Sequence, residues 1–161
     1  MTGRDVPAGN SPVPADHVQR WQETTAAAFR TAHPRTWTIT LPPGLKMLSL
    51  NGRYHWSERD RRNKAFMKAA WAMALQAKIP RLDRVIVTAE YQPPDRRARD
   101  ADNIALAAKS GIDGLVKAGV LPDDDSSHVL RVECRIGEPY PRGRLVLHVT
   151  EITGPPTGAT P

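Results

Sequence analysis

Residues 96–128 read RRARDADNIALAAKSGIDGLVKAGVLPDDDSSH, with arginines at the start, an apolar-periodic run in the middle and carboxylates at the end. The middle of this stretch predicts a helix that begins at Asp102, a favourable N-cap, and runs to about Ala118, before a stop at Gly119. The inward-facing stripe of this helix is Ile104, Ala108, Ile112 and Leu115. Gly111 inside the helix costs about 1 kcal/mol relative to alanine, which indicates close packing at that position.

We expect strands on both sides of this helix. Val85–Tyr91 is rich in β-branched and apolar residues, as in a central strand. After the acidic loop, residues 130–136 alternate between apolar and charged side chains, which places Cys134 on the buried face of a strand. A last strand around Leu145–Val149 is expected to pair with it as a hairpin.

The first half of the chain supplies two more helices and one more strand. Residues 16–31 carry apolar side chains at helical spacing, and Thr36–Leu41 alternates as a first strand. Ser57 is the expected cap of a long helix that ends near Lys78. Its expected inward stripe is Phe66, Ala70, Met73 and Ala77. The order helix, β, α, β, α, β, β predicts an α+β fold with a small mixed sheet of about four strands and two main helices.

Both ends of the chain are rich in proline, glycine and small polar residues, and ordering them would cost entropy with little burial in return. We therefore divide the chain into three parts. Residues 1–35 form an extension that is disordered at 1–15 and helical after it, residues 36–153 form the domain, and residues 154–161 form a disordered tail.

Length and charge limit the possible functions. The chain has 161 residues, enough for one domain with a hydrophobic core, and a formal net charge of +6 that favours an acidic partner. Residues 53–99 hold twelve lysines and arginines against five acids, whereas residues 100–125 hold two against six. A basic segment beside an acidic one is typical of a protein that binds a polyanion and a divalent metal ion.

Cys134 is the single cysteine, which excludes an internal disulfide and a thiolate zinc cluster. No run approaches the roughly 18 apolar residues of a membrane-spanning helix. The amino-terminus lacks the basic-then-apolar order of a signal peptide. We therefore expect a cytoplasmic protein without a membrane partner.

The acids around the predicted helix form the candidate metal site. In an extended chain, Asp100 and Asp102 lie on the same side, within reach of one ion. Alternatively, Asp102 is only a helix cap and Asp100 only a partner of the arginines. The acids at residues 123–125 leave the helix about 25 Å further on and must fold back to join the pair. Carboxylates without histidine or cysteine select a hard ion, Mg²⁺ or Mn²⁺.

Helix geometry separates two further residues near these acids. Asp113 lies about 16 Å along the helix from Asp102, which excludes it as a ligand of the same ion. Lys109 lies two turns from Asp102 on the same face. Its side chain is either a phosphate contact at the helix start or a solvated surface lysine.

The loop at residues 50–56 joins polar, basic and aromatic side chains, a mixture that can stack on bases and hold phosphates. Alternatively, it is a turn in which Tyr54 and Trp56 cover the core. The basic residues of the following helix are either phosphate contacts or a solvated face. The residues that we assign to phosphate contact in this region are Arg53, Arg61, Arg62 and Lys64.

Two segments carry a resemblance to a known family. They are PDRRARDADN at residues 94–103 and AGVLPDDD at residues 118–125, with weaker matches in ITLPP at 39–43, NGRY at 51–54 and GRL at 143–145. Over about residues 37–152 the sequence resembles the RusA-type Holliday junction resolvases, which are phage-derived endodeoxyribonucleases.

The resemblance implies the RusA-like resolvase fold and a homodimer that makes paired symmetric nicks in a four-way DNA junction, using Mg²⁺. It implies that Asp100, Asp102 and Asp124 are the metal-binding catalytic acids and that Lys109 is the catalytic lysine. The arginines that match its DNA-binding residues are Arg96, Arg97 and Arg99. The lysine lies three residues later here than the family's spacing places it.

The expected function is therefore a Mg²⁺-dependent, structure-selective endodeoxyribonuclease that resolves Holliday junctions in DNA recombination and repair. The alternative is a non-catalytic protein that binds branched DNA, such as a prophage remnant, in which the acids only pair with arginines. A nuclease that acts on RNA or on flaps would share the site and differ in its substrate.

Overall fold

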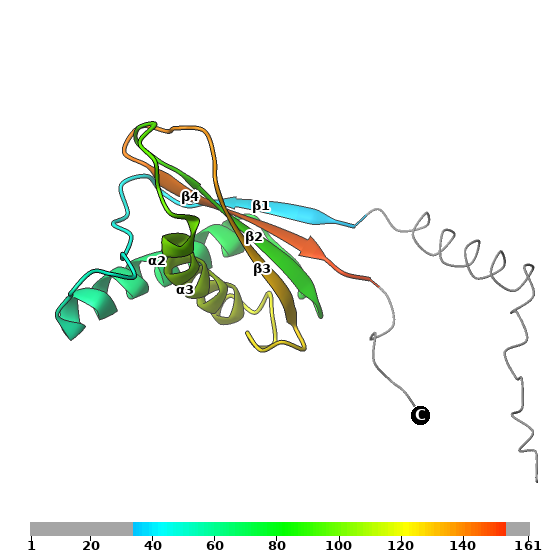
Figure 1. The fold of residues 1–161 in the computed structure, drawn as a ribbon. Coiled ribbons are helices and arrows are strands. Elements are labelled where there is room, and N and C mark those ends of the chain that lie inside the picture. The colour runs from blue at the N-terminus through cyan, green and yellow to red at the C-terminus, as the bar shows by residue number, and fades with distance from the viewer. Residues whose placement is uncertain (1–33, 154–161) are drawn as a thin grey trace, which may run out of the picture. The chain divides into compact units, whose positions relative to one another are not determined.

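The computed structural model describes residues 34–153 (Figure 1). The elements are β1 (Thr36–Thr40), α2 (Trp56–Gln76), β2 (Val85–Gln92), the 3₁₀ turn η1 (Ala101–Asn103), α3 (Ile104–Lys117), β3 (Val129–Ile136) and β4 (Arg144–Glu151). The helix predicted at residues 16–31 and the predicted disordered ends lie outside the described residues. Within residues 34–153, no helix combines the length and the apolar composition needed to cross a membrane.

The four strands form one mixed sheet in the order β1-β4-β2-β3. β4 is antiparallel to both β1 and β2, while β2 and β3 are parallel and joined through α3. The predicted α+β fold, with a small mixed sheet and two helices, is thus confirmed.

The predicted hairpin between the last two strands is wrong, because β4 lies between β1 and β2 and does not pair with β3. Leu145, Leu147 and Val149 of β4 are all buried. Since a strand with this much apolar surface is stabilised most at the centre of a sheet, it takes the inner position. β3, in which charged residues alternate with apolar ones, occupies the edge of the sheet.

Helices α2 and α3 cover one face of the sheet (Figure 1), and the core lies between them and the inward side chains of the strands. The four apolar residues predicted to face inward on α3 are all buried. On α2, Phe66 and Ala70 are buried as predicted, but Ala74 takes the place of Ala77, which is exposed.

Two glycines of α3 allow this packing. A Cβ added at Gly111 would lie 2.8 Å from Cδ1 of Leu147 in the sheet, which confirms the close packing predicted there. A Cβ added at Gly114 would lie 2.5 Å from the carbonyl oxygen of Met67 in α2. The backbones of α2 and α3 therefore approach each other only because this position carries no side chain.

β3 is less buried than its pattern predicted. Among its apolar residues only Val129 is buried, while Leu130, Val132 and Ile136 are 45%, 42% and 39% exposed. Cys134, expected in the core, is only partly buried. The reason is the edge position of β3, where the cover of the helices ends.

Candidate metal and nucleic-acid site

The chain enters α3 through a turn that Asp100 caps. Asp100 has an extended backbone, and its Oδ1 accepts a hydrogen bond from the backbone N–H of Asp102 at 3.0 Å. The prediction that Asp102 caps the helix is therefore wrong, because the 3₁₀ turn η1 precedes α3 and moves the cap back by two residues. Ser57 is likewise not the cap of α2, since His55 holds that position and its Nδ1 accepts from the N–H of Ser57 at 3.4 Å.

Asn103 connects this turn to the loop before α2. It occupies the N-cap position of α3 but makes no side-chain capping bond. Instead its Oδ1 accepts a hydrogen bond from the backbone N–H of Leu50 at 2.9 Å. The loop at residues 50–56 is thereby fixed beside the two acids, although the segments are about fifty residues apart in the chain.

The arginines next to these acids pair elsewhere. Arg99 Nη1 lies 2.8 Å from Oδ1 of Asp95, and Arg97 Nε lies 3.8 Å from Oδ2 of the same residue. Arg96 Nη2 lies 3.2 Å from Oε2 of Glu138. The hydrogen bond from Arg99 and that from the backbone of Arg97 lower the pKa of the Asp95 carboxyl. Arg97 and Arg99 therefore pair with Asp95, five residues before Asp100, and not with Asp100 itself.

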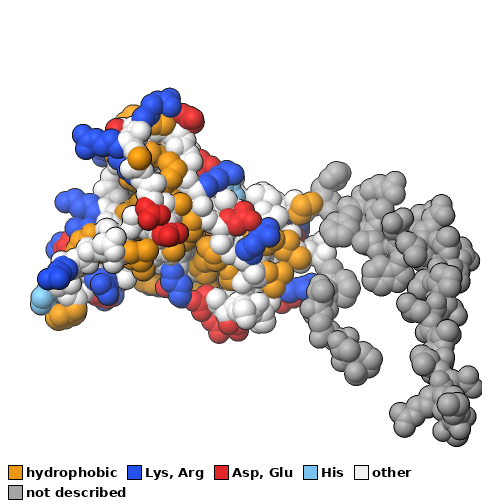
Figure 2. All heavy atoms as spheres, in the orientation of Figure 1, with side chains coloured by type: hydrophobic (Ala, Val, Ile, Leu, Met, Phe, Trp, Pro, Cys, Tyr) orange, Lys and Arg blue, Asp and Glu red, His pale blue; other side chains and the backbone are white. Residues whose placement is uncertain are grey.

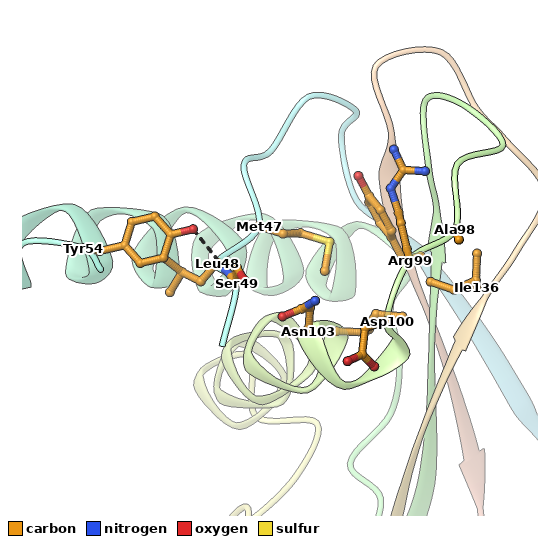
Figure 3. Close-up of a pocket in the computed structure, with 11 residues that line it drawn as sticks. Met47, Leu48, Ser49, Tyr54, Ala98, Arg99, Asp100, Asn103 and Ile136 are labelled. Carbon is orange, nitrogen blue, oxygen red and sulfur yellow. Dashed lines mark hydrogen bonds between the residues drawn. The ribbon is translucent and has the colours of Figure 1, made fainter. Parts of the chain in front are cut away.

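Asp100 and Asp102 are consequently left without a cation. Both are exposed, and within residues 34–153 neither forms an ion pair. Figure 3 shows the guanidinium of Arg99 and the carboxylate of Asp100 pointing in opposite directions. The alternative in which Asp100 serves only as a partner of the arginines does not describe this arrangement.

A cleft of about 370 Å³ opens beside Asp100 (Figure 3). It is lined by Met47, Leu48, Ser49, Tyr54, Tyr91, Ala98, Arg99, Asp100, Asn103, Ile104 and Ile136. Its apolar wall comes from the loop before α2 and from the end of β3, and its polar rim comes from the segment that leads into α3. The partly exposed Ile136 thus borders this cleft.

Asp102 lies near the inner side of β3. Burial, and after it the negative charge of Asp102, raises the pKa of the Cys134 thiol. This proximity is not predictable from the sequence, because it depends on the parallel pairing of β3 with β2. Asp102 is thus close enough to β3 for its charge to act on Cys134.

The second acidic group is arranged differently. Lys109 Nζ donates to Asp113 Oδ1 at 2.7 Å and also contacts Asp124 Oδ2. Bonds to Asp113 and then to Asp124 raise the pKa of Lys109, and the bond to Lys109 lowers the pKa of Asp124. The loop after α3 therefore folds back along the helix, as expected. Its acid Asp124 pairs with Lys109, however, and does not join Asp100 and Asp102 in a metal-binding group.

Asp113 is thus the functional neighbour that the sequence reasoning missed. Helical geometry excludes Asp113 as a ligand of an ion at Asp102, but that argument does not identify Asp113 as the partner of Lys109. A signal was present, since Lys109 and Asp113 are four residues apart on a helix, the spacing of a side-chain ion pair. The same spacing relates Asp95 to Arg99.

The donor chemistry of the acid pair fits a hard divalent ion. Asp100 and Asp102 offer carboxylate oxygens, the ligands that Mg²⁺ and Mn²⁺ prefer, and no lysine or arginine in the described part of the chain pairs with them. However, within the described residues no set of three or more histidine, cysteine, aspartate or glutamate side chains is placed to hold a metal ion. For Asp124 to act as a third ligand beside Asp100 and Asp102, it would have to release Lys109 and bind the ion instead.

The basic residues of α2 fall into two groups. Arg61 and Arg62 both pair with Glu58, and Lys64 pairs with Asp60 at 2.7 Å. Arg62 also donates to the carbonyl oxygen of Met47 and stacks over Tyr54, so it serves the packing of the preceding loop. In residues 34–153, Arg53 and Arg59 are exposed cations at this end of α2 that form no ion pair, and Lys46, whose charge acts on Glu58, forms none either.

No protein-family model matches the chain, and no curated protein matches it.

Proposed function

We infer that the chain is a Mg²⁺-dependent, structure-selective endodeoxyribonuclease of the RusA type, which resolves four-way DNA junctions by paired symmetric cleavage. The observation that carries this inference is the unpaired state of Asp100 and Asp102. Three arginines lie within six residues of them, and each arginine pairs with another acid. Because the neighbouring arginines pair with other acids, these two exposed carboxylates remain free to bind a metal ion.

The residues of the chain have distinct tasks in this proposal. Asp100 and Asp102 hold the ion at the start of α3, where Mg²⁺ supplies polarisation of a phosphodiester and activation of water. Arg96 and Arg97 extend into solvent beside them and position the DNA backbone through phosphate contacts. Arg99 is only partly exposed, pairs with Asp95 and serves mainly to hold this segment in place.

Lys109 and Asp124 act as a pair in the same proposal. Lys109 keeps Asp124 ionised and holds the loop against α3. A direct role of Lys109 at the phosphate requires its release from both Asp113 and Asp124. Paired symmetric cuts require two sites, so the active form in this proposal is a homodimer.

The test uses a synthetic four-way junction and a matched duplex, each with and without Mg²⁺. We expect the wild-type protein to cut the junction symmetrically and only with Mg²⁺, and Asp100→Asn to bind the junction without cutting it. The matched control is Asp83→Asn, which removes an exposed carboxylate whose ion pairs are with Arg84 and His128. Equal cutting of duplex and junction would contradict resolvase activity, and an inert wild-type protein would contradict the nuclease itself.

A second candidate function is the binding of branched DNA without cleavage. The observation that favours it is the engagement of Asp124 by Lys109, which leaves the acid pair without a third ligand in the described residues. In that case the wild-type protein and Asp100→Asn bind the junction equally, and Mg²⁺ has no effect on either.

A further inference from the structure

The two aromatic residues of the loop before α2 are in opposite environments. Tyr54 is half-buried, its hydroxyl accepts a hydrogen bond from the N–H of Ser49 at 3.2 Å, and the guanidinium of Arg62 lies 4.9 Å from its ring centre. A Cβ added at Gly52 would lie only 2.2 Å from the Tyr54 ring. Tyr54 is therefore built into the loop, as the packing interpretation expected.

Trp56 is not part of that packing. It is the first residue of α2 and is 74% exposed, more than any other large hydrophobic residue in the described part of the chain. Its ring contact is with His55, a tilted arrangement with the centroids 5.6 Å apart. His55 caps the helix with its own side chain, so the start of α2 does not depend on the indole. The interpretation in which Trp56 covers the core is wrong.

The surroundings of Trp56 are cationic. Arg53 and Arg59 lie three residues before and after it, and neither forms an ion pair within residues 34–153. Arg59 is at the i+3 position, so the two side chains are neighbours on the helix surface. The acids of this turn are already occupied, Glu58 by Arg61 and Arg62 and Asp60 by Lys64.

The end of α2 that carries Trp56 extends beyond the sheet at the left of Figure 1. At the same place in Figure 2, hydrophobic and basic side chains lie together with a histidine. This end is also linked to the acid pair, because Leu50 in its loop donates to Asn103, the residue after Asp102. Tyr54, two residues before Trp56, also lines the cleft beside Asp100. The exposed indole therefore stands at the start of a helix whose preceding loop is tied to the acid pair.

We propose that Trp56 stacks on an unstacked nucleobase of branched DNA, such as one at the branch point, while Arg53 and Arg59 contact the phosphates on either side of that base. An exposed indole presents a flat face that binds any base, and flanking cations bind the backbone. The bases of an intact duplex are stacked on each other and offer no such face. The branched substrate rests on the proposed function, and Trp56 adds a reason for the choice of branched DNA over duplex.

A membrane surface is the other partner that an exposed tryptophan with arginines can bind. That interaction needs a continuous apolar face to enter the lipid. Trp56 is instead followed by Ser57, Glu58, Arg59 and Asp60. An isolated aromatic ring among charges favours a nucleobase.

The experiment measures binding of the full-length chain carrying Asp100→Asn, without Mg²⁺, so that cleavage does not interfere. The probes are a four-way junction and a single strand, each with 2-aminopurine at the branch point or at mid-strand, and an unlabelled duplex. We expect quenching of 2-aminopurine fluorescence on binding. Adding Trp56→Ala should abolish the quenching and weaken binding to the junction and to the single strand by roughly 5- to 150-fold. Trp56→Phe should retain most of both signals.

The matched control is Leu75→Ala, which removes another exposed apolar side chain from α2 and should change neither signal. Duplex binding should change by less than about twofold in all variants. Circular dichroism melting of each variant checks that the fold is intact.

Unchanged junction binding and quenching in Trp56→Ala would overturn the proposal, as would an equal loss of duplex binding. A Trp56-dependent association with anionic phosphatidylglycerol vesicles or with RNA alone, in the absence of DNA binding, would overturn it as well. Cleavage is measured separately on the wild-type chain with Mg²⁺. Trp56-dependent quenching without cleavage would leave this proposal standing and reject the nuclease, whereas cleavage with no effect of Trp56→Ala would do the opposite.

Discussion

The two acidic groups along α3 are built in opposite ways. At its start, Asp100 and Asp102 form no ion pair within residues 34–153, although three arginines precede them closely in sequence. Further along, Asp124 is held by Lys109, which Asp113 shares. Exposed carboxylates without an ion-pair partner add little to the stability of the fold, so the first group gains a function only with a ligand. The second group stabilises a loop.

The largest effect is expected at the unpaired group. Asp100→Asn and Asp102→Asn should each lower Mg²⁺-dependent junction cleavage by at least about 100-fold, because loss of a direct ligand should exceed the loss of an outer hydrogen bond to one. Thermal stability should stay nearly unchanged, since neither substitution removes an ion pair of the described residues. Cleavage rates and melting curves of the same preparations test both parts. A clear fall in melting temperature would contradict the contrast between the groups.

A second test uses the two acids that share Lys109. Asp124→Asn and Asp113→Asn should lower the free energy of unfolding by similar amounts, because each removes one partner of the same lysine. Only Asp124→Asn should also reduce cleavage by roughly tenfold or more, since Asp124 is the proposed third ligand. Asp113→Asn thus serves as the matched control for the loss of the ion pair. Equal cleavage by both variants would limit Asp124 to a structural role.

Lys109→Met tests the stabilising side of the comparison directly. The three side chains are partly exposed, so solvent screening limits the expected loss to about 1 kcal/mol in the free energy of unfolding. Urea unfolding measures this loss, and hydrogen exchange should show faster opening of residues 119–128. A loss confined to cleavage, with stability unchanged, would instead indicate that Lys109 acts at the phosphate.

The smallest expected effect is a dependence on pH. Lys109 lowers the pKa of Asp124, so their interaction stabilises the fold above the ordinary aspartate pKa and is lost as pH falls through the lowered value. At the alkaline end, the raised pKa of Lys109 means that the interaction is lost as pH rises through that value. Between about pH 5 and pH 2, Asp124→Asn should therefore lose less stability than the wild type. Identical pH profiles of melting temperature would contradict this.

Local patterns predicted much of this fold, because helix and strand periodicity depends on neighbouring residues. The buried stripe of α3 and the close packing at Gly111 follow from spacing and residue size alone. The place of β4 between β1 and β2 does not, since it results from competition among strands that are distant in sequence. The same strand order leaves β3 at the exposed edge of the sheet. It also brings Cys134 close enough to Asp102 for the carboxylate charge to raise the pKa of the thiol.

The candidate site was predictable in its residues and less so in their partners. The acids and arginines are visible in the sequence, but the choice of Asp95 rather than Asp100 as the partner of Arg99 depends on how the segment before η1 bends. The capping residue is Asp100 and not Asp102, because the 3₁₀ turn η1 precedes the helix. The helical pattern begins near both residues and therefore does not distinguish between them. The exposure of Trp56 could not be predicted from the sequence, because Tyr54, another aromatic residue of the same loop, is packed while Trp56 is not.

The contact between Gly114 and α2 limits which sequences this fold can accept. Any side chain there meets backbone atoms, the carbonyl of Met67 and the N–H of Trp71, which cannot turn aside as a flexible side chain does. In a saturation library of the chain, Gly114 should therefore tolerate almost no substitution. Gly119, where an added Cβ meets nothing within 4 Å, is restricted only by its φ of +76° and should accept asparagine. Two glycines five residues apart thus differ in mutational tolerance for unrelated reasons, one because of its neighbours and the other because of its own backbone.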